Sequence, residues 1–425
     1  MQRTSSVEPM KTKAMNNRLK KDALEIISFA IKRSDPYEKT LETLKTLEIS
    51  GKGKLVVFGI GKAAAPMAKA AEDLFGERIS FGTVVTKYGH AKGFSFKNFE
   101  IIEAAHPVSD ENSVLAAEKA LAVAETLKEE DTCLVLLSGG GSALFEKSSI
   151  PFETQKDITK KLLSRGAAIE EINTVRRSVS LVKGGKFAEK VYPAKVITCA
   201  LSDVLSNEKS AIASGITVPE PTDSEKIKAV FQKYLPEYGS LFSSLPKRES
   251  GRINSGGFFF VGDINSLCDA AEEKAKELGY SVINPSRSLT GEAREEAKKI
   301  LSSVKPESGK HAYIFGGETT VTLKGNGLGG RNQEMALSAA IELSGRKNIV
   351  FASAGSDGTD GPTDAAGGIA DGNTAEEIRK AGLDPKKELE NNNSYYALMA
   401  ADSLIVTGPT GTNVNDLSVV LTAGA

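Results

Sequence analysis

The sequence has little of what several classes of protein depend on. It contains no tryptophan, three histidines and three cysteines in 425 residues. Cys133, Cys199 and Cys268 stand singly beside apolar residues, which argues against a disulfide framework and against a zinc site. Three scattered histidines also argue against a histidine-rich metal centre. We therefore expect buried thiols in a reducing compartment and a cytoplasmic protein.

Long apolar runs and a strong net charge are missing too. No stretch approaches the ~18 apolar residues that a membrane-spanning helix requires. The formal net charge is −1, and no basic face carries interleaved aromatic residues. Neither a membrane nor a nucleic acid is expected as a partner. The basic start of the chain has no apolar core, so we expect a frayed tail rather than a secretory signal.

What is present predicts two domains of alternating strands and helices. A chain of 425 residues is too long for one ordinary core. The alternation predicts an α/β fold, with a parallel sheet covered by helices on both faces. Phe231–Ser255 is polar and contains two prolines and several serines, so we place the junction there. The predicted domains are residues 1–245 and 246–425, and Gly257–Val261 is expected to begin the second block.

The most informative stretch is Asp131–Phe145, DTCLVLLSGGGSALF. Leu134–Leu137 is typical of a strand that is buried on both faces, and it leads directly into Ser138–Ser142. Three glycines let successive backbone N–H groups point at one anion, and a helix that begins near Ser142 would add its dipole. The alternative is a tight turn from strand to helix without a ligand. This stretch alone does not decide between the two.

Two further loops follow apolar strands. Gly59-Ile-Gly61-Lys62 follows the first strand, and Ser202–Asn207, which includes Asp203, follows strand Val196–Leu201. Ligands of parallel sheets bind at the carboxyl ends of strands, so all three loops are predicted to share one edge. A dinucleotide fingerprint is weak here, because Ala64 takes the place of its last glycine. His106, before Pro107, is expected to be a structural loop histidine.

The basic segment INTVRRSVSLVKGGK has two readings. Arg176, Arg177, Lys183 and Lys186 lie close to two glycines. A charge run of this kind is usually a solvated face, and the glycines favour an anion contact only modestly.

The second half adds a cation and carboxylates. Gly325–Gly330 leads into a helix that begins with Arg331. Phosphoryl transfer requires backbone N–H groups and cations around phosphates, with carboxylates for Mg²⁺ and for orienting the attacking hydroxyl. The candidate carboxylates are Asp203, Glu318, Asp357, Asp360 and Asp364. The alternative for the acidic loop is a turn in which each Asp binds its own backbone.

Several motifs together resemble one family. They are GIGKAAAPMA, AAHPVSDENS, LSGGGSALFE, INTVRRSVSLVKGGK, LSDVLSNE, ASGITVPEPT, GGETTVTLKGNGLGGRNQE, SAGSDGTDGPTDAAGG and TGPTGTNVNDL. In this order, from about Lys54 to Leu417, they resemble the class II glycerate kinase family, whose C-terminal region is the MOFRL domain. The resemblance implies two three-layer α/β/α domains, the first a Rossmann-like parallel sheet and the second a mixed sheet, with the active site in a cleft between them. The last segment would be free to pack back on that cleft.

The resemblance also implies an activity. The expected enzyme phosphorylates D-glycerate with ATP and Mg²⁺, or another divalent cation, to give 2-phosphoglycerate and ADP. The alternative is a sugar-phosphate isomerase or a phosphosugar-binding sensor, which would not need the C-terminal motifs. Small molecules are the expected partners of a monomer or homodimer.

Residue by residue, the resemblance implies the following sites. The catalytic residues would be Lys62, Arg331, Asp203 and Asp357, with Asp203 and Asp357 as candidate metal ligands. Substrate would be bound by Lys62, Arg331, Ser138 and Asn207. The nucleotide would be bound by Gly59, Gly61, Gly139, Gly140, Gly141, Ser142, Thr410 and Asn413. Arg177-Ser178 departs from the family, whose members often carry Lys-His there.

Overall fold

The computed structural model describes residues 7–49, 52–221, 223–245, 251–305 and 308–424, without the side chains of 7–15 and 244. The chain forms two compact units. One consists of Pro36–Val261, and the other joins the residues up to Asp35 to those from Gly262 onward. Each unit is described by itself.

The unit of residues 36–261 is built on a six-stranded sheet with the order β3-β2-β1-β4-β5-β6. Its strands are β1 (Leu55–Ile60), β2 (Ile79–Lys87), β3 (Phe99–Ala104), β4 (Thr132–Leu137), β5 (Lys195–Leu201) and β6 (Asn254–Gly262). Strands β1 to β5 pair in parallel, which confirms the predicted Rossmann-like sheet. The order reverses between β1 and β4, and Ile60 pairs with Leu137 there, so both strands end at the same level.

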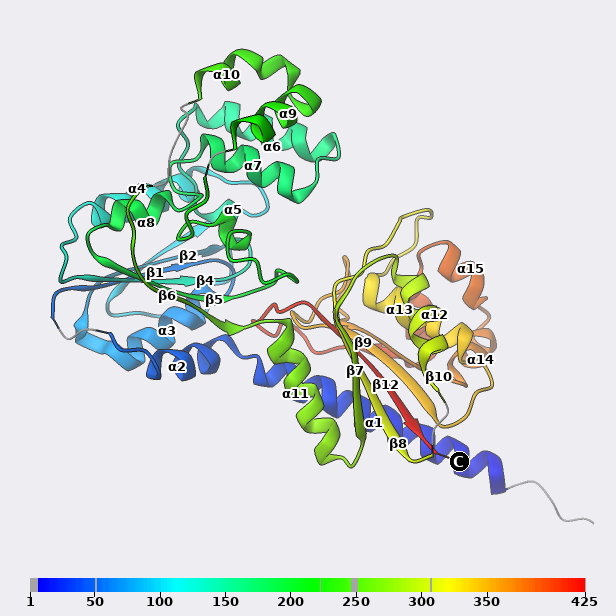
Figure 1. Cartoon of the computed structure of the whole chain (residues 1–425). Coiled ribbons are helices and arrows are strands. Elements are labelled where there is room, and N and C mark those ends of the chain that lie inside the picture. The colour runs from blue at the N-terminus through cyan, green and yellow to red at the C-terminus, as the bar shows by residue number, and fades with distance from the viewer. Residues whose placement is uncertain (1–6, 50–51, 222, 246–250, 306–307, 425) are drawn as a thin grey trace, which may run out of the picture. The chain divides into compact units, whose positions relative to one another are not determined.

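Helices cover both faces of this sheet, as Figure 1 shows for α2 and α3 on one face and α4 and α8 on the other. Strands β1 and β4 are buried at every position and apolar except at Gly59 and Thr132, because both of their faces are covered. The helices are α2 (Pro36–Lys45), α3 (Ala64–Phe75), α4 (Glu111–Ala124), α5 (Gly141–Leu144) and α8 (Lys186–Val191), with 3₁₀ turns η1 (Gly76–Arg78) and η2 (Ile212–Ser214).

A separate group of helices has its own small core. It consists of α6 (Phe152–Ser164), α7 (Ile169–Val179), α9 (Ser224–Tyr234), η3 (Pro236–Tyr238) and α10 (Gly239–Ser244). Phe231 and Leu235 are buried there together with Ile158, Leu162 and Ile172. The prediction of an irregular junction over Phe231–Ser255 is therefore wrong for the helical part. Apolar residues between the prolines and serines anchor it.

Strand β6 corrects a second expectation. Gly257–Val261 does not begin the second block, because β6 is the edge strand of the first sheet and Phe258 and Phe260 pack against its core. At the other end, α1 (Val7–Arg33) belongs to the unit of residues 262–425. The observed units thus differ from the predicted division 1–245 and 246–425 at both ends. Residues 246–250 lie outside the described part.

The second unit is built on a mixed sheet, as predicted, with the order β11-β10-β9-β12-β8-β7. Only β7 and β8 pair in parallel among its described pairings. Its strands are β7 (Ser281–Leu289), β8 (Lys310–Gly317), β9 (Ile349–Gly355), β10 (Gly367–Asp371), β11 (Leu404–Ile405) and β12 (Asp416–Ala423). Strand β12 lies in the centre of the sheet and has the apolar residues Val419, Val420 and Leu421 in its middle. It was not among the strands that we expected from the sequence.

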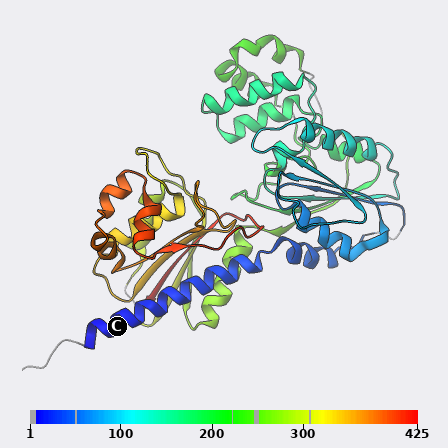
Figure 2. The same cartoon turned by 180° about the vertical axis from the view of Figure 1, so that it is seen from behind.

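Helices α1 and α11 cover one face of this sheet, and α12 and α13 cover the other (Figures 1 and 2). In the described part of α1, Leu19, Ala23, Ile26, Ile27 and Ala30 are buried, and the Tyr280 hydroxyl donates to Asp22 (2.6 Å). Besides α1, the helices of this unit are α11 (Ile264–Glu277), α12 (Ala293–Ser303), α13 (Arg331–Glu342), α14 (Thr374–Lys380), α15 (Pro385–Glu390) and α16 (Ser394–Ala400).

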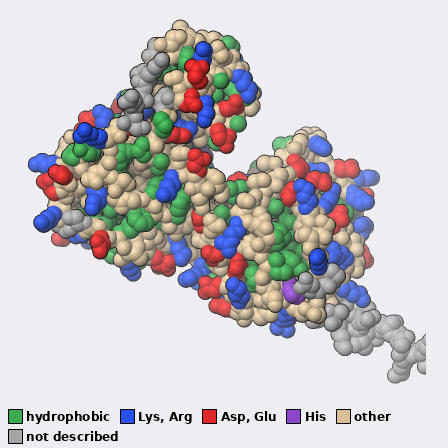
Figure 3. All heavy atoms as spheres, viewed as in Figure 1, with side chains coloured by type: hydrophobic (Ala, Val, Ile, Leu, Met, Phe, Trp, Pro, Cys, Tyr) green, Lys and Arg blue, Asp and Glu red, His purple; other side chains and the backbone are tan. Residues whose placement is uncertain are grey.

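The surface carries charges of both signs. On the face in Figure 3, Lys and Arg side chains lie among Asp and Glu side chains, in keeping with the net charge of −1. Of the helices in the described residues, none combines the length and the apolar character needed to cross a bilayer.

Candidate active site

The first group of predicted site residues lies at the carboxyl ends of β1, β4 and β5. The loops after β1 and β4 are joined directly, since the Lys62 N–H donates to the Gly139 carbonyl (2.9 Å) and the Ala63 N–H donates to Ser138 Oγ (3.0 Å). This junction stands where the strand order reverses, which is where open α/β sheets bind ligands. The structure thus brings Gly61, Lys62 and the Ser138–Ser142 loop together, as the strand pattern predicted.

Close approach explains the glycines of this loop. A Cβ on Gly61, whose φ is +130°, would lie 2.3 Å from Ser138 Oγ, and one on Gly139 would lie 2.2 Å from Asp203 Oδ2. Gly59 is different, because it is a buried strand residue whose Cβ would press against the Ala64 carbonyl at the start of α3. Its position indicates a packing role.

The predicted helix near Ser142 is only the four-residue α5, so its dipole cannot be the main attraction for an anion. The donors come instead from the loop before it. Among the described residues, no hydrogen bond uses the backbone N–H groups of Gly139 and Gly140. Two successive free N–H groups beside Lys62 form a donor set that fits a phosphate chain.

Asp203 follows β5 and lies on the other side of Gly139. Burial raises the pKa of its carboxyl, and the nearby charge of Lys62 partly offsets this. Asn207 lies in the following turn, with a left-handed φ of +50° and its N–H donating to the Val204 carbonyl (2.9 Å). A carboxylate next to a lysine and a glycine loop can hold a divalent cation or accept a proton.

His106 was not predicted as a site residue, yet it lies in this group. A Cβ on Gly140 would be 3.0 Å from His106 Cδ2 and 3.3 Å from Lys62 Cγ, so both side chains flank the loop. Burial and the charges of Lys62 and Lys87 lower the pKa of His106 to about 4. Its position after β3 was the available signal, because that loop ends on the same edge of the sheet.

The second group of predicted residues lies in the unit of residues 262–425, around Arg331 at the start of α13. Its guanidinium forms a fork with Asp416, with Nε 2.5 Å from Oδ2 and Nη2 2.9 Å from Oδ1. Nη1 lies 3.1 Å from Glu318 Oε1. Burial alone would lower the pKa of Arg331, but the two carboxylates raise it by more. Neither Glu318 nor Asp416 was predicted to be a partner of this arginine.

The carboxylates of the acidic loop have different tasks. Asp360 is buried and accepts from the N–H groups of Asn332 (3.2 Å) and Gln333 (2.8 Å), so it caps α13 from a distant loop. Asp357 accepts from the Thr359 N–H (3.0 Å), which is the turn arrangement considered as the alternative. Asp364 accepts from the Tyr395 hydroxyl (2.8 Å).

Thr410 lies beside Asp357, and Asn413 follows in the same loop between β11 and β12. The Thr410 N–H donates to the Asp357 carbonyl (3.3 Å), and its hydroxyl donates to the Ser356 carbonyl (2.6 Å). Asn413 Oδ1 accepts from the Asn415 N–H (3.3 Å). Asp203 and Asp357 belong to different units. In the part of the chain that the structure describes, no group of three or more His, Cys, Asp or Glu side chains could hold a metal ion.

Comparison with known proteins covers both units. A family described as "Domain of unknown function (DUF4147)" matches residues 22–241, and the MOFRL family matches residues 311–416. The D-glycerate 2-kinase of Thermotoga maritima is 46% identical over 413 aligned positions, and the match covers 95% of this chain and 98% of that protein. The glycerate 2-kinase of Pyrococcus horikoshii is 39% identical, over 94% of this chain and 96% of its own length.

A solved structure has the same fold. The crystal structure of glycerate kinase from Thermotoga maritima superimposes with a TM-score of 0.89 at 45% sequence identity. The match covers 96% of this chain and 100% of that one. The likeness thus extends through both units.

Proposed function

The chain belongs to the class II glycerate kinase family, and from this premise we propose that it phosphorylates D-glycerate with ATP. Transfer to the 2-hydroxyl gives 2-phosphoglycerate and ADP, as the names of the two glycerate 2-kinases suggest. Relatives with this activity match nearly the whole chain. This favours a kinase over a sugar-phosphate isomerase or a phosphosugar sensor, neither of which needs the C-terminal motifs.

The observation that carries the proposal is the hydrogen bond from Lys62 to Gly139 at the reversal of the strand order. It holds a lysine beside two unused N–H donors, which suits the phosphates of a nucleotide. ATP, when bound, supplies the phosphoryl group. The chain's own part is to neutralise charge and fix the direction of transfer. Lys62 and the Ser138–Ser142 loop serve the phosphates, and Ser138 also packs the loop against Ala63.

Arg331 is proposed to bind the carboxylate of glycerate. Its planar fork already binds Asp416 through two nitrogens, which is the geometry that a substrate carboxylate also requires. Of the guanidinium nitrogens, Nη1 contacts Glu318, which also accepts from Asn415 Nδ2 (3.1 Å), and Glu318 is the partner that an anionic substrate would replace. Asp357, Asn207, Thr410 and Asn413 are proposed to complete the contacts to glycerate and nucleotide.

Asp203 has one of two roles in this proposal. Mg²⁺ is commonly held by one or two carboxylates together with phosphate oxygens, and Asp203 beside the glycine loop fits this donor set. Its raised pKa equally suits a base that accepts the proton of the attacking hydroxyl. Asp203→Asn separates the two roles. A changed dependence of rate on Mg²⁺ concentration indicates metal binding, whereas a lower kcat with unchanged Mg²⁺ dependence indicates the base. Asp357→Asn is tested in the same way.

The remaining assignments concern the setting of the enzyme. Cys133, Cys199 and Cys268 are buried and unpaired, which supports the proposed cytoplasmic location. We propose a monomer or homodimer that acts on small molecules without nucleic acid or membrane. Light scattering of the purified protein tests the oligomeric state.

A coupled assay tests the activity. The protein is incubated with ATP, Mg²⁺ and D-glycerate, and the product is passed to enolase without a phosphoglycerate mutase. Signal without mutase supports the 2-phosphate, and signal that appears only with mutase indicates the 3-phosphate. Absence of both defeats the kinase proposal. Lys62→Ala should lose orders of magnitude in kcat, whereas the control Lys128→Ala, which changes an exposed lysine of the same unit, should not.

A further inference from the structure

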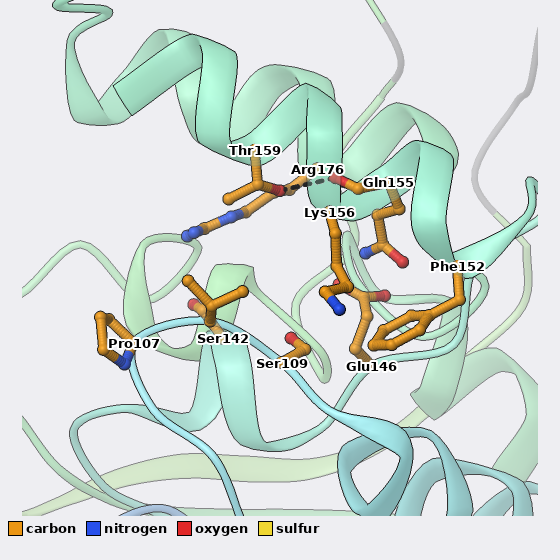
Figure 4. A pocket seen from close by; sticks show the side chains of 10 residues that line it. Pro107, Ser109, Ser142, Glu146, Phe152, Gln155, Lys156, Thr159 and Arg176 are labelled. Carbon is orange, nitrogen blue, oxygen red and sulfur yellow. Dashed lines mark hydrogen bonds between the residues drawn. The ribbon is translucent and has the colours of Figure 1, made fainter. Parts of the chain in front are cut away.

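A second basic side chain faces the end of the glycine loop. Arg176, on α7, lines a pocket together with Ser142, Pro107 and Gln155. Figure 4 shows its side chain extending across this pocket toward Pro107 and Ser142. The proposed function does not yet include this arginine. From the sequence alone, its segment INTVRRSVSLVKGGK could be either a solvated face or an anion contact.

Arg176 lacks the partner that its neighbours have. Arg177 Nε lies 3.0 Å from Glu220 Oε2, and the buried Lys183 Nζ lies 2.9 Å from Glu146 Oε2. The guanidinium of Arg176 makes no hydrogen bond or ion pair with any described residue. It lies near Glu146, but that carboxylate already binds Lys183 and the Ser180 hydroxyl (2.7 Å).

An unpaired charge in a partly buried position is costly unless a ligand completes it. Burial lowers the pKa of Arg176, and the attraction of Glu146 offsets only part of this. Besides burial, Lys62, Lys87 and Arg176 all help to lower the pKa of His106, so three cations lie around this loop. An anion bound there would be attracted by each of them.

A second side chain of the pocket is also incomplete. Gln155, on α6, is 6% exposed, and its Oε1 is buried without a hydrogen-bond partner among the described residues. Its amide nitrogen likewise donates to no described residue, and Figure 4 shows the amide pointing into the pocket. Ser142, which follows the free N–H groups of Gly139 and Gly140, connects this pocket to the glycine loop.

We propose that Arg176 binds a phosphate group of the nucleotide next to the Ser138–Ser142 loop, with the Gln155 amide as a further polar contact. The inference rests on the proposed kinase function, because it takes ATP as the source of the phosphates. It assigns a binding task to the helical group, whose α6 and α7 carry both side chains. Arg176 then adds a second cation, besides Lys62, to the phosphate contacts of the loop.

The test compares Arg176→Met with Arg177→Met in the full-length protein. Methionine keeps much of the side-chain volume and removes the charge, and Arg177 provides a paired arginine on the same helix. Calorimetric titration with ADP and with tripolyphosphate measures the phosphate contact, while the KM for D-glycerate measures the acceptor site. Arg176→Met should weaken both phosphate ligands about ten- to a hundredfold and leave the KM for glycerate within about twofold. Arg177→Met should change neither.

Thermal unfolding separates binding from a structural role. Removing an uncompensated charge should leave the Tm of the free protein unchanged or higher, and should reduce the rise in Tm that ADP produces. A large fall in Tm without ADP would overturn the proposal, as would wild-type affinity for ADP and tripolyphosphate. A rise only in the KM for glycerate would assign Arg176 to the acceptor instead. If tripolyphosphate binding depends on Arg176 but the wild type phosphorylates nothing, the anion site stands and the kinase proposal fails.

Discussion

Gly139 and Asp203 face each other so closely that a Cβ atom on Gly139 would lie 2.2 Å from Oδ2 of Asp203. The loop after β4 and the carboxylate after β5 can therefore hold their positions only with glycine at residue 139. Real side chains do not approach to this distance, so any substitution must move one partner.

Gly139→Ala should move Asp203 or the loop and lower kcat/KM by about two orders of magnitude, because small misplacement of catalytic groups is costly. The coupled enolase assay measures this. Gly239→Ala is the matched control, since Gly239 has ordinary φ and a Cβ added there would meet no atom within 4 Å. Wild-type kcat/KM in Gly139→Ala would show that the contact with Asp203 is not needed.

Arg331→Lys should lose most of the activity of the wild type, although lysine keeps the positive charge. A lysine cannot form the two-pronged contact that Arg331 makes with Asp416, nor contact Glu318 at the same time. We expect kcat/KM for glycerate to fall at least about a hundredfold, as for the loss of a charge-assisted fork. Arg287→Lys is the control, because Arg287 pairs with Asp269 and Glu272 elsewhere in the same unit. Near-normal kinetics of Arg331→Lys would remove the fork from the mechanism.

His106 should make the fold less stable in mild acid. Its pKa is about 4 in the folded protein because of burial and neighbouring cations, against 6.5 for an ordinary histidine. Between these values the unfolded chain binds a proton that the folded chain does not, so the free energy of unfolding falls as pH drops from about 6.5 to 4. Urea unfolding at pH 7.5 and 5 measures the fall.

His106→Gln provides the comparison for that experiment. The substitution removes the titrating imidazole. The free energy of unfolding of this variant should therefore fall less between pH 7.5 and 5 than that of the wild type. Equal losses in both proteins would mean that His106 is protonated alike in the folded and unfolded states.

Asp360→Ala should destabilise the start of α13. The substitution leaves the N–H groups of Asn332 and Gln333 without their acceptor, which should cost about 1–3 kcal/mol of the free energy of unfolding. Asp364→Ala, in the same loop but exposed, should cost less than about 1 kcal/mol. Urea unfolding at pH 7.5 measures both. Similar losses would contradict the capping role.

The pH dependence of Asp360 has the opposite sign to that of His106. Burial raises its pKa to about 6, and the hydrogen bonds from Gln333 and Asn332 limit the rise. Between pH 3.8 and 6 the folded chain binds the proton more readily, so this group's contribution to stability decreases as pH rises through that range. The difference in the free energy of unfolding between the wild type and Asp360→Ala, measured across this pH range, isolates the contribution of Asp360.

The sequence was sufficient for much of the first unit. Leu134–Leu137 is a continuous apolar run, and Val196–Leu201 is apolar except for Thr198. Glycine or polar loops follow both, and these local signals predicted β4, β5 and the edge on which Lys62 and Gly139 meet. The mixed second sheet followed from the family resemblance. The local pattern offered Arg331 only as a cation after a glycine-rich loop, and the same resemblance gave it a catalytic and substrate-binding role.

What the sequence did not reveal depends on contacts between distant residues. Arg331 begins α13 and Asp416 begins β12, 85 residues later, so their pairing arises only in the folded chain. The same holds for the capping of α13 by Asp360. Asp360 was therefore grouped with catalytic carboxylates. Likewise, β6 has an ordinary strand pattern in the sequence. That it belongs to the first sheet follows only from its pairing with β5 in the folded structure.

The path of the chain sets the order in which the protein can be completed during synthesis. Helix α1 is synthesised before the unit of residues 36–261, yet it packs against β9 and β12, and β12 ends only at Ala423. Residues 36–261 form a whole unit between these partners and can fold while the rest is still being translated. The apolar face of α1, with Leu19 and Ile26, can pack against α11 early, but its contacts with β9 and β12 form only after those strands have been synthesised. The burial of α1 is thus completed late, and a chain that stops short of β12 leaves part of this apolar face exposed to chaperones and proteases.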